Sequence, residues 1–254
     1  MSYLLYCILN GHRGWARPML SGVREQTVWV LKCADLCAAV SQAAEPSSSR
    51  HQPNSAPPVD DLVAYAKVVE AFNRGETVVP MRYGCRFSGV SEVRAWVRKG
   101  AAQLRTLLHR VDGCVEMGVR ALLAETRPPA SSARSAAAVA ARPGAAYLSA
   151  RRRELALAQH SDRIAQTVRE ALSGRFRECV AETGRWGRGP MVSLYFLVER
   201  GRLHAFRDAF GRITSAPGAL MLSGPWPPYN FVCDTAGGGD ELAPHESRTM
   251  RGVR

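Results

Sequence analysis

Side chains that can do chemistry are present in this chain, but they are not grouped into a recognisable catalytic set. The six histidines are isolated, and none lies four residues from another or beside a carboxylate motif. Cys33 and Cys37 are one helical turn apart, but no nearby histidine would complete a zinc site. Neither a G-x-S-x-G motif nor a P-loop occurs. We therefore expect a protein that is not an enzyme and that holds no metal or cofactor.

A glycine-rich stretch late in the chain has a composition that suits phosphate binding. It contains Gly184, Arg185, Gly187, Arg188 and Gly189. Backbone N–H groups of such a loop hold phosphate where the loop opens a helix. Here the stretch leads instead into Val192 to Glu199, whose apolar residues are typical of a strand. We therefore predict a hairpin connection rather than a phosphate site.

The chain is strongly basic, with a formal net charge of +12 over 254 residues. Only Lys32, Lys67 and Lys99 are lysines, so 31 of the 34 basic residues are arginines. Two interpretations are open. The arginine and alanine content can follow from a GC-rich genome, or the charge can serve a surface that meets nucleic acid, an anionic membrane or an acidic protein. Arginine suits protein interfaces because its planar guanidinium pairs with both oxygens of a carboxylate.

Cysteine usage and hydropathy predict a soluble cytoplasmic protein. The seven cysteines are scattered, odd in number and form no C-x-x-C pair, which favours reduced thiols. The first apolar run, Ser2 to Leu9, is short and has no basic stretch before it, so it predicts a strand rather than a signal peptide. No stretch approaches the roughly 20 apolar residues of a membrane span.

The pattern of residues 1–112 predicts an N-terminal α/β domain. Strands are expected at Ser2 to Leu9, Gln26 to Lys32 and Val78 to Tyr83, and helices from Asp35, from Asp60 or Asp61 to Phe72, and from Ser91 to Val111. The second helix is predicted to be capped by its aspartate and to end at Gly75. Residues 45–58 are rich in proline and serine, and we expect them to form a flexible surface loop.

Residues 113–234 are predicted to form a ferredoxin-like C-terminal domain, so the expected fold class is α+β. Their elements follow the order β-α-β-β-α-β, the split pattern of that fold, with an antiparallel sheet and both helices on one face. These elements are expected at Cys114 to Leu123, Gly144 to Phe176, Cys179 to Glu182, Val192 to Glu199, Leu203 to Ile213 and Ala219 to Leu222. A low-complexity insert is expected at 126–142 and a frayed tail at 235–254.

The long helix predicted from Gly144 to Phe176 is expected to project in part. Its length of roughly 45 Å, at 1.5 Å per residue, exceeds what a compact small domain needs. Its apolar residues, which include Leu155 and Ile164, are interpreted as one seam, with Arg151 and Arg152 on the charged opposite face. We expect the seam to bind a helix of another protein and the charged flanks to determine which helix binds.

The last predicted strand leads into Ser223 to Val232, with the sequence SGPWPPYNFV. Each proline fixes its own φ and biases the preceding residue towards extended backbone, so a stiff polyproline-like strut is predicted. Such a strut would display Trp226, Tyr229 and Phe231 at a low entropic cost of docking. The pair Pro225 and Pro228 fits a minimal P-x-x-P ligand, but a structural strut is favoured. For Trp226, packing in the core or between domains is favoured over a role as an exposed anchor.

Several segments, in one order along the chain, resemble a known family. SGPWPPYNFV is similar to the C-terminal signature of the gas-vesicle accessory proteins F and L. Further similar segments are Tyr3 to Tyr6 (the family's first strand), Asp35 to Ser41 (its early D-L-x-A-V-V-S-like turn), Val79 to Gly84 (its L-P-M-R-F-G segment), Val111 to Gly113 with Glu116, and Pro143-Gly144 followed by Tyr147-Leu148 and Arg151-Arg152. The ordered set of matches spans nearly the whole chain.

The resemblance implies a cytoplasmic, gas-vesicle-associated protein that is not an enzyme and needs no cofactor. It implies help with shell assembly through binding of the small hydrophobic shell protein or other accessory proteins. A chaperone-like or scaffolding role is physically reasonable, because an unpolymerised shell subunit exposes apolar surface. For Arg82, an ion pair within this protein is favoured over a contact to another protein. The candidate contact residues are Arg82, Tyr83, Arg151, Arg152, Leu155, Ile164, Trp226, Pro227, Pro228, Tyr229 and Phe231.

Binding of nucleic acid, as a basic ferredoxin-like RNA-binding protein, is the alternative that the composition supports. Arg151 to Arg153 and the run Arg185 to Arg188 supply clustered cations, the latter with a tryptophan for stacking. The aromatic-rich strand signature of RNA-binding sheets is absent, and Val192 to Val198 is expected to be buried on both faces. With the resemblance, the gas-vesicle interpretation is preferred.

Overall fold

The structure is a computed structural model that describes residues 2–11, 20–43, 57–123, 143–186, 189–213 and 219–232. The chain divides into two compact units: unit 1 contains Met1–Val115 and the segment from Trp226 onward, and unit 2 contains Glu116–Pro225. The predicted C-terminal domain, 113–234, includes the segment from Trp226, which the structure groups with unit 1. Most of the predicted loop at 45–58, and all of the insert at 126–142 and the tail at 235–254, lie outside the described residues.

The sheet of unit 1 has the strand order β2-β3-β4-β1-β5, and β6 also pairs with β1. Its strands are β1 (Ser2–Asn10), β2 (Leu20–Ser21), β3 (Thr27–Cys33), β4 (Leu36–Ala43), β5 (Val78–Pro80) and β6 (Arg86–Phe87). The pairings between them are antiparallel. The strands predicted at the N-terminus, from Gln26 and from Val78 are therefore confirmed.

The helix predicted from Asp35 is wrong, because this segment forms the central strand β4. Ala34, whose φ is +58°, and Asp35 make the turn of a hairpin that pairs Cys33 with Leu36. From Leu36 to Ser41 every residue of β4 is buried between β3 and β1. A short apolar run that is buried on both faces has no alternation, so its pattern does not distinguish a strand from a helix.

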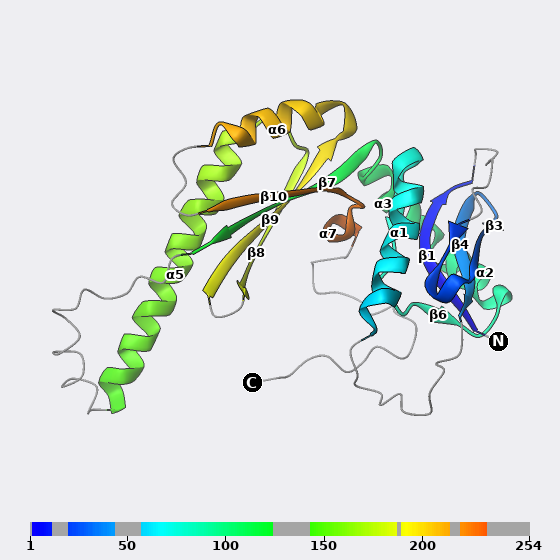
Figure 1. Cartoon of the computed structure of the whole chain (residues 1–254), viewed down its shortest axis with the longest axis horizontal. Helices are drawn as coiled ribbons and strands as arrows, with labels where there is room; N and C mark the ends of the chain where they lie inside the picture. The colour runs from blue at the N-terminus through cyan, green and yellow to red at the C-terminus, as the bar shows by residue number, and fades with distance from the viewer. Residues whose placement is uncertain are drawn as a thin grey trace. The chain divides into compact units, whose positions relative to one another are not determined.

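Helices cover both faces of this sheet (Figure 1). Neighbouring residues of a strand point to opposite faces, and β1 and β4 accordingly contribute to two separate cores. The core under α1 (Val59–Gly75) contains Leu4, Tyr6, Cys37, Ala39, Tyr65, Val68 and Phe72. The core under α2 (Val90–Lys99) and α3 (Ala101–Arg110) contains Leu5, Ile8, Ala38, Val40, Val93, Val97, Leu104 and Leu108. Unit 1 thus combines an antiparallel sheet with helices on both of its faces.

The single helix predicted from Ser91 to Val111 is divided in two at Gly100. This residue ends α2 and begins α3, and its φ of −89° and ψ of 5° lie outside regular helical values. Its N–H still donates to the carbonyl oxygen of Trp96 at 3.0 Å. Glycine is a poor helix former, and here it is also buried. The break allows the apolar stripes of both short helices to face the sheet.

Unit 2 follows the predicted β-α-β-β-α-β order of elements. They are β7 (Cys114–Leu122), α5 (Pro143–Ala171), β8 (Glu178–Trp186), β9 (Gly189–Glu199), α6 (Leu203–Gly211) and β10 (Leu220–Trp226). The sheet order is β10-β7-β9-β8, and β8 pairs with β9 as an antiparallel hairpin that joins Trp186 to Gly189. The predicted hairpin is confirmed, but Gly184 and Arg185 lie within β8 rather than in the connection.

The core of unit 2 lies between its sheet and the two helices. Alternate residues of the strands, among them Met117 and Val119 of β7 and Leu194 and Phe196 of β9, pack against α5 and α6. The helices contribute Ile164, Val168, Leu172, Phe206 and Ala209. Figure 1 shows α5 continuing past the strands of unit 2 at its N-terminal end. The central strand β9 is buried along most of its length, as predicted.

Candidate functional site

The proline-rich segment after residue 222 begins as a strand rather than as a polyproline strut. β10 continues through Ser223, Gly224 and Pro225 to Trp226, and Gly224 takes a φ of +109°, which a residue with a Cβ rarely adopts. The Ser223 hydroxyl donates to the carbonyl oxygen of Gly118 at 3.3 Å, within unit 2. Backbone pairing with β7 therefore fixes this segment in the sheet.

The aromatic and proline residues of this segment differ in exposure. Trp226 is 43% exposed, so the favoured interpretation of Trp226 as a packed residue is not what the structure shows. Pro227 and Pro228 are buried, and Phe231 is fully buried. Phe231 is therefore a packing residue in this fold, whereas the Trp226 indole is accessible to a partner.

Residues Tyr229–Val232 form the helical turn α7, which packs within unit 1 against β5. Tyr229 packs on the core under α1, and Val232 packs on the core under α2 and α3. The strand β5 leads directly into Met81, Arg82 and Tyr83. The segment at 79–84 and the end of the SGPWPPYNFV segment, Tyr229–Val232, which both belong to the resemblance, therefore lie together in unit 1.

The hydroxyl of Tyr65 connects the segment at 79–84 to the first strand. It lies 2.9 Å from the carbonyl oxygen of Leu5, 3.0 Å from that of Met81, 3.2 Å from that of Tyr6 and 3.3 Å from that of Arg82. Burial, reinforced by the neighbouring hydroxyl of Tyr229, raises the pKa of Tyr65 well above its usual value. The neutral phenol is thus a stable donor. The sequence pattern shows Tyr65 only as one apolar position of a helix.

A buried carboxylate lies beside this tyrosine. Asp61 accepts hydrogen bonds from Arg24 at 3.2 and 3.3 Å and from the Tyr83 hydroxyl at 3.3 Å, while the Tyr83 ring packs edge-to-face on Tyr65. The predicted aspartate cap is wrong, because α1 begins after Pro58 without a side-chain cap. Burial and the charge of Asp61 raise the pKa of Tyr83. Tyr83 is therefore held in place, whereas Arg82 is exposed.

The predicted apolar seam of α5 is two separate stripes. Ile164 is fully buried in the core of unit 2, whereas Leu155 is 59% exposed. Leu148 and Tyr147 are also exposed, as are Arg151 and Arg152. Ile164 is therefore not available to a partner in this fold, and the N-terminal half of α5 presents a mixed apolar and basic surface.

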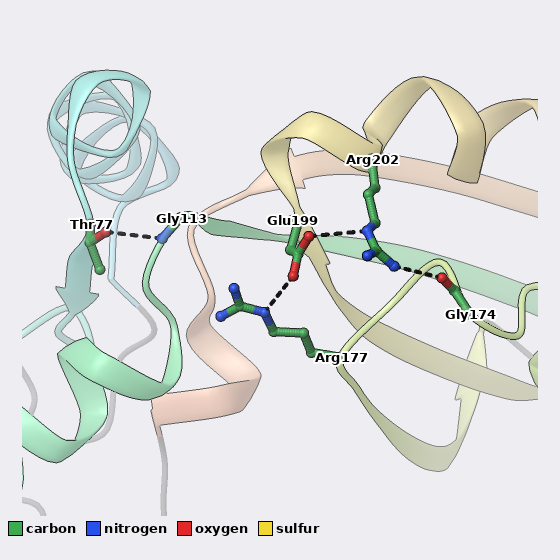
Figure 2. Close-up of polar contacts among 6 residues, drawn as sticks. All are labelled: Thr77, Gly113, Gly174, Arg177, Glu199 and Arg202. Atoms are coloured by element: carbon green, nitrogen blue, oxygen red, sulfur yellow. Dashed lines mark hydrogen bonds and ion pairs between the residues drawn. The ribbon is translucent and has the colours of Figure 1, made fainter.

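Most of the other polar contacts that the structure describes are structural. In unit 2, Glu199 accepts from Arg177 at 3.0 Å and from Arg202 at 3.1 Å, and Arg202 also donates to the carbonyl oxygen of Gly174 at 2.8 Å (Figure 2). In unit 1, the N–H of Gly113 donates to the Thr77 hydroxyl at 3.3 Å (Figure 2). These contacts attach loops to the ends of neighbouring strands and helices.

The groups that most often hold metals or act as nucleophiles are either dispersed or buried in the described ranges. No cluster of three or more histidine, cysteine, aspartate or glutamate side chains within the described ranges is placed to hold a metal ion. Five of the six cysteines in these ranges are buried, and burial raises the pKa of Cys85 to about 12. Among the helices that the structure describes, none has the length and apolar character needed to cross a membrane.

The two units each combine an antiparallel sheet with helices, which is the architecture of an α+β protein. The sequence comparison is more specific. The chain belongs to the gas vesicle synthesis protein GvpL/GvpF family, whose model matches residues 2–233. The resemblance found in the sequence is confirmed.

Two relatives that are named as gas vesicle proteins are similar to this chain. The chain is similar to gas vesicle protein F2 of Halobacterium salinarum, with 28% identity over 61% of this chain and 58% of the relative. It is also similar to gas vesicle protein F of Haloferax mediterranei, with 28% identity over 63% of this chain and 62% of the relative. The chain thus spans less than two thirds of the length of these relatives.

Solved structures show the same fold. The crystal structure of GvpF from Microcystis aeruginosa matches with a TM-score of 0.72 at 16% identity, over 91% of this chain and 99% of that chain. GvpF from Anabaena sp. PCC7120 matches with a TM-score of 0.68 at 16% identity, over 91% and 98% of the two chains. At this identity the likeness concerns the fold, which is a mixture of helices and antiparallel sheets.

Proposed function

We propose that this protein is a gas vesicle accessory protein that assists assembly of the vesicle shell by binding the shell protein and other accessory proteins. The observation that carries the proposal is the family match over residues 2–233. The similar proteins from two haloarchaea, each named as a gas vesicle protein F, support it. Binding, rather than catalysis, is the form of assistance, and the protein acts in the cytoplasm and at the vesicle.

A binding role suits the chemistry of shell assembly. A shell subunit that is apolar enough to line a gas space exposes apolar surface before it polymerises, and such surface aggregates unless another protein covers it. Tryptophan makes strong anchors at protein interfaces because it buries a large area with few rotatable bonds. Trp226, 43% exposed and held by backbone pairing at the end of β10, has these properties.

The domain organisation is part of the same proposal. The order β-α-β-β-α-β and the sheet order β10-β7-β9-β8 support a ferredoxin-like assignment for unit 2. We propose domain limits of 1–112 and 113–234; the first boundary lies three residues before the end of unit 1 at Val115. The candidate contact residues that remain accessible are Arg82, Arg151, Arg152, Leu155 and Trp226, with Tyr83 and Tyr229 partly accessible.

The proposal is tested by capture of purified gas vesicle proteins on the full chain, after nuclease treatment, at low and at physiological salt. We expect salt-resistant capture of the shell protein or of an accessory protein, weakened by Trp226→Ala. Met221→Ala is the matched control, because Met221 lies on the same strand and is 49% exposed. Failure to capture any vesicle protein, together with salt-labile binding of RNA added in a separate assay, would contradict the proposal and favour RNA binding.

A further inference from the structure

A stripe of exposed side chains runs along the N-terminal half of α5. It consists of Leu148, Arg151, Arg152 and Leu155, which we call the α5 stripe. Leu148 is 61% and Leu155 59% exposed, and both arginines are exposed. The ion pair between Arg151 and Glu154, at 3.0 Å, leaves both side chains more than two thirds exposed, and such pairs contribute little. Two solvent-exposed leucines on one helix face form a small apolar surface that a partner protein can bury.

The geometry of the helix makes this stripe separate from the core of unit 2. Each residue advances about 100° around an α-helix, so Leu148 and Leu155 are about 20° apart, with Arg151 and Arg152 on either side. Ile164 is nine residues beyond Leu155 and lies on the opposite face, where it is fully buried. A partner can therefore bind the stripe without displacing a core residue.

Charge argues against a second copy of this chain as the partner. An antiparallel pairing that places Leu148 against Leu155 of the second copy also places Arg151 against Arg152 of that copy. A parallel pairing in register places each arginine against its own counterpart. Both arrangements bring like charges together, which destabilises helix pairs. A helix with carboxylates at the facing positions instead gains ion pairs with the arginines while its apolar residues cover the leucines.

We propose that the α5 stripe binds an acidic amphipathic helix of another gas vesicle protein. The partner helix carries apolar residues seven positions apart, and aspartate or glutamate at the positions between them. This inference rests on the proposed accessory function and adds to it the surface and the chemistry of one partner. Arginine rather than lysine at both positions favours carboxylate partners, because the guanidinium pairs with both oxygens.

The test uses the full chain and two designed helical peptides of about three heptads. Both have leucine at the seam, and one has glutamate and the other lysine between the leucines. We expect the glutamate peptide to bind and the lysine peptide not to bind. The double variants Leu148→Ser/Leu155→Ser and Arg151→Glu/Arg152→Glu should each weaken binding of the glutamate peptide by about tenfold or more. The second variant should also gain binding of the lysine peptide.

The control is Arg94→Glu/Arg98→Glu, which makes the same change of net charge on exposed residues of α2 in unit 1. It should leave peptide binding unchanged, and circular dichroism should show that all variants fold. Equal binding of both peptides, an equal loss in the control, a chain that dimerises through Leu148 and Leu155, or displacement of the peptide by single-stranded RNA would each overturn the inference.

The peptide assay contains no vesicle protein, so its result is independent of the capture experiment. If vesicle proteins are captured through Trp226 and neither peptide binds the α5 stripe, the stripe proposal is wrong and the accessory function stands. If the glutamate peptide binds and no vesicle protein is captured, the accessory function is wrong, and with it the gas vesicle identity of the partner.

Discussion

Leu155 and Ile164 lie on opposite faces of α5, although both belong to the apolar pattern of that helix. Their separation of nine residues corresponds to about 180° around the helix axis. Ile164 is fully buried against the sheet of unit 2, and Leu155 is 59% exposed. One helix thus stabilises its own unit with its C-terminal half and presents leucines to solvent with its N-terminal half.

Alanine substitution at these two positions should give opposite results. Ile164→Ala removes buried methyl and methylene groups and leaves a cavity, so we expect it to lower the free energy of unfolding by about 2–5 kcal/mol. Leu155→Ala removes exposed atoms and should change it by less than about 0.5 kcal/mol. Urea titration followed by circular dichroism measures both. Equal losses for the two variants would show that both faces of α5 are packed.

Removal of the Tyr65 hydroxyl should destabilise unit 1. In Tyr65→Phe the ring remains, but the carbonyl oxygens of Leu5 and Met81 lose a donor in a buried site. We expect a loss of about 1–3 kcal/mol in the free energy of unfolding. Tyr147→Phe, at a side chain that is 69% exposed, is the control and should be neutral. A neutral Tyr65→Phe would mean that the hydroxyl does not connect these segments in solution.

Gly22 should not tolerate alanine. A Cβ at this position would meet the hydroxyl of Tyr6 and would lie 2.8 Å from a methyl group of Val28. Tyr6 cannot shift easily, because it is fully buried and its hydroxyl is 3.0 Å from the Ser41 hydroxyl. Gly22→Ala should therefore cost about 1–3 kcal/mol of stability.

The control for Gly22 is Gly184→Ala, a strand position with no atom near the added Cβ. There alanine should be neutral or slightly stabilising, because it restricts the unfolded chain. Thermal unfolding of both variants measures the difference. A larger loss at Gly184 than at Gly22 would contradict the packing described around Tyr6.

The Glu199 cluster should make a contribution to stability that depends on pH. The hydrogen bond from Arg177, and then the charge of Arg202, hold the pKa of Glu199 below its ordinary value of 4.5. A lowered folded pKa means that the stabilisation is present above the unfolded pKa and is lost as the pH falls through the folded one. Wild type should exceed Glu199→Gln in stability near neutral pH, with a difference that disappears in acid. Urea titration at neutral and at acid pH measures the difference in stability between wild type and Glu199→Gln. The same difference at both pH values would show that it does not come from the ionised Glu199 carboxylate.

Strong periodicity and ordered motifs made much of this fold predictable. The apolar run of the first strand, the alternation in β3, the stripe of the helix after Pro58 and the order of elements in unit 2 are all present as predicted. The predictions that depend on local pattern alone were less accurate. The run from Leu36 is buried on both faces, so it lacks a period, and Gly100 breaks a helix whose apolar stripe continues on both sides.

The candidate site was predictable only in part, because tertiary contacts decide which of its residues are exposed. Trp226 and Phe231 look equivalent in the sequence, yet Trp226 ends a strand at 43% exposure and Phe231 is fully buried within α7. From the sequence pattern alone Tyr65 is assigned to an apolar stripe and Asp61 to a helix cap, and neither assignment indicates their hydrogen bonds. Their hydrogen bonds join strand β1, helix α1 and the segment after β5, which are distant in the sequence.

The measurement that most directly tests the central claim is the yield of gas vesicles, counted by electron microscopy, in cells that express a complete vesicle gene set with or without this chain. We expect vesicles to be lost when the chain is removed and restored when it is supplied again. Trp226→Ala should restore fewer vesicles than Met221→Ala at equal protein levels. Formation of vesicles in normal number without the chain would contradict an accessory role in shell assembly.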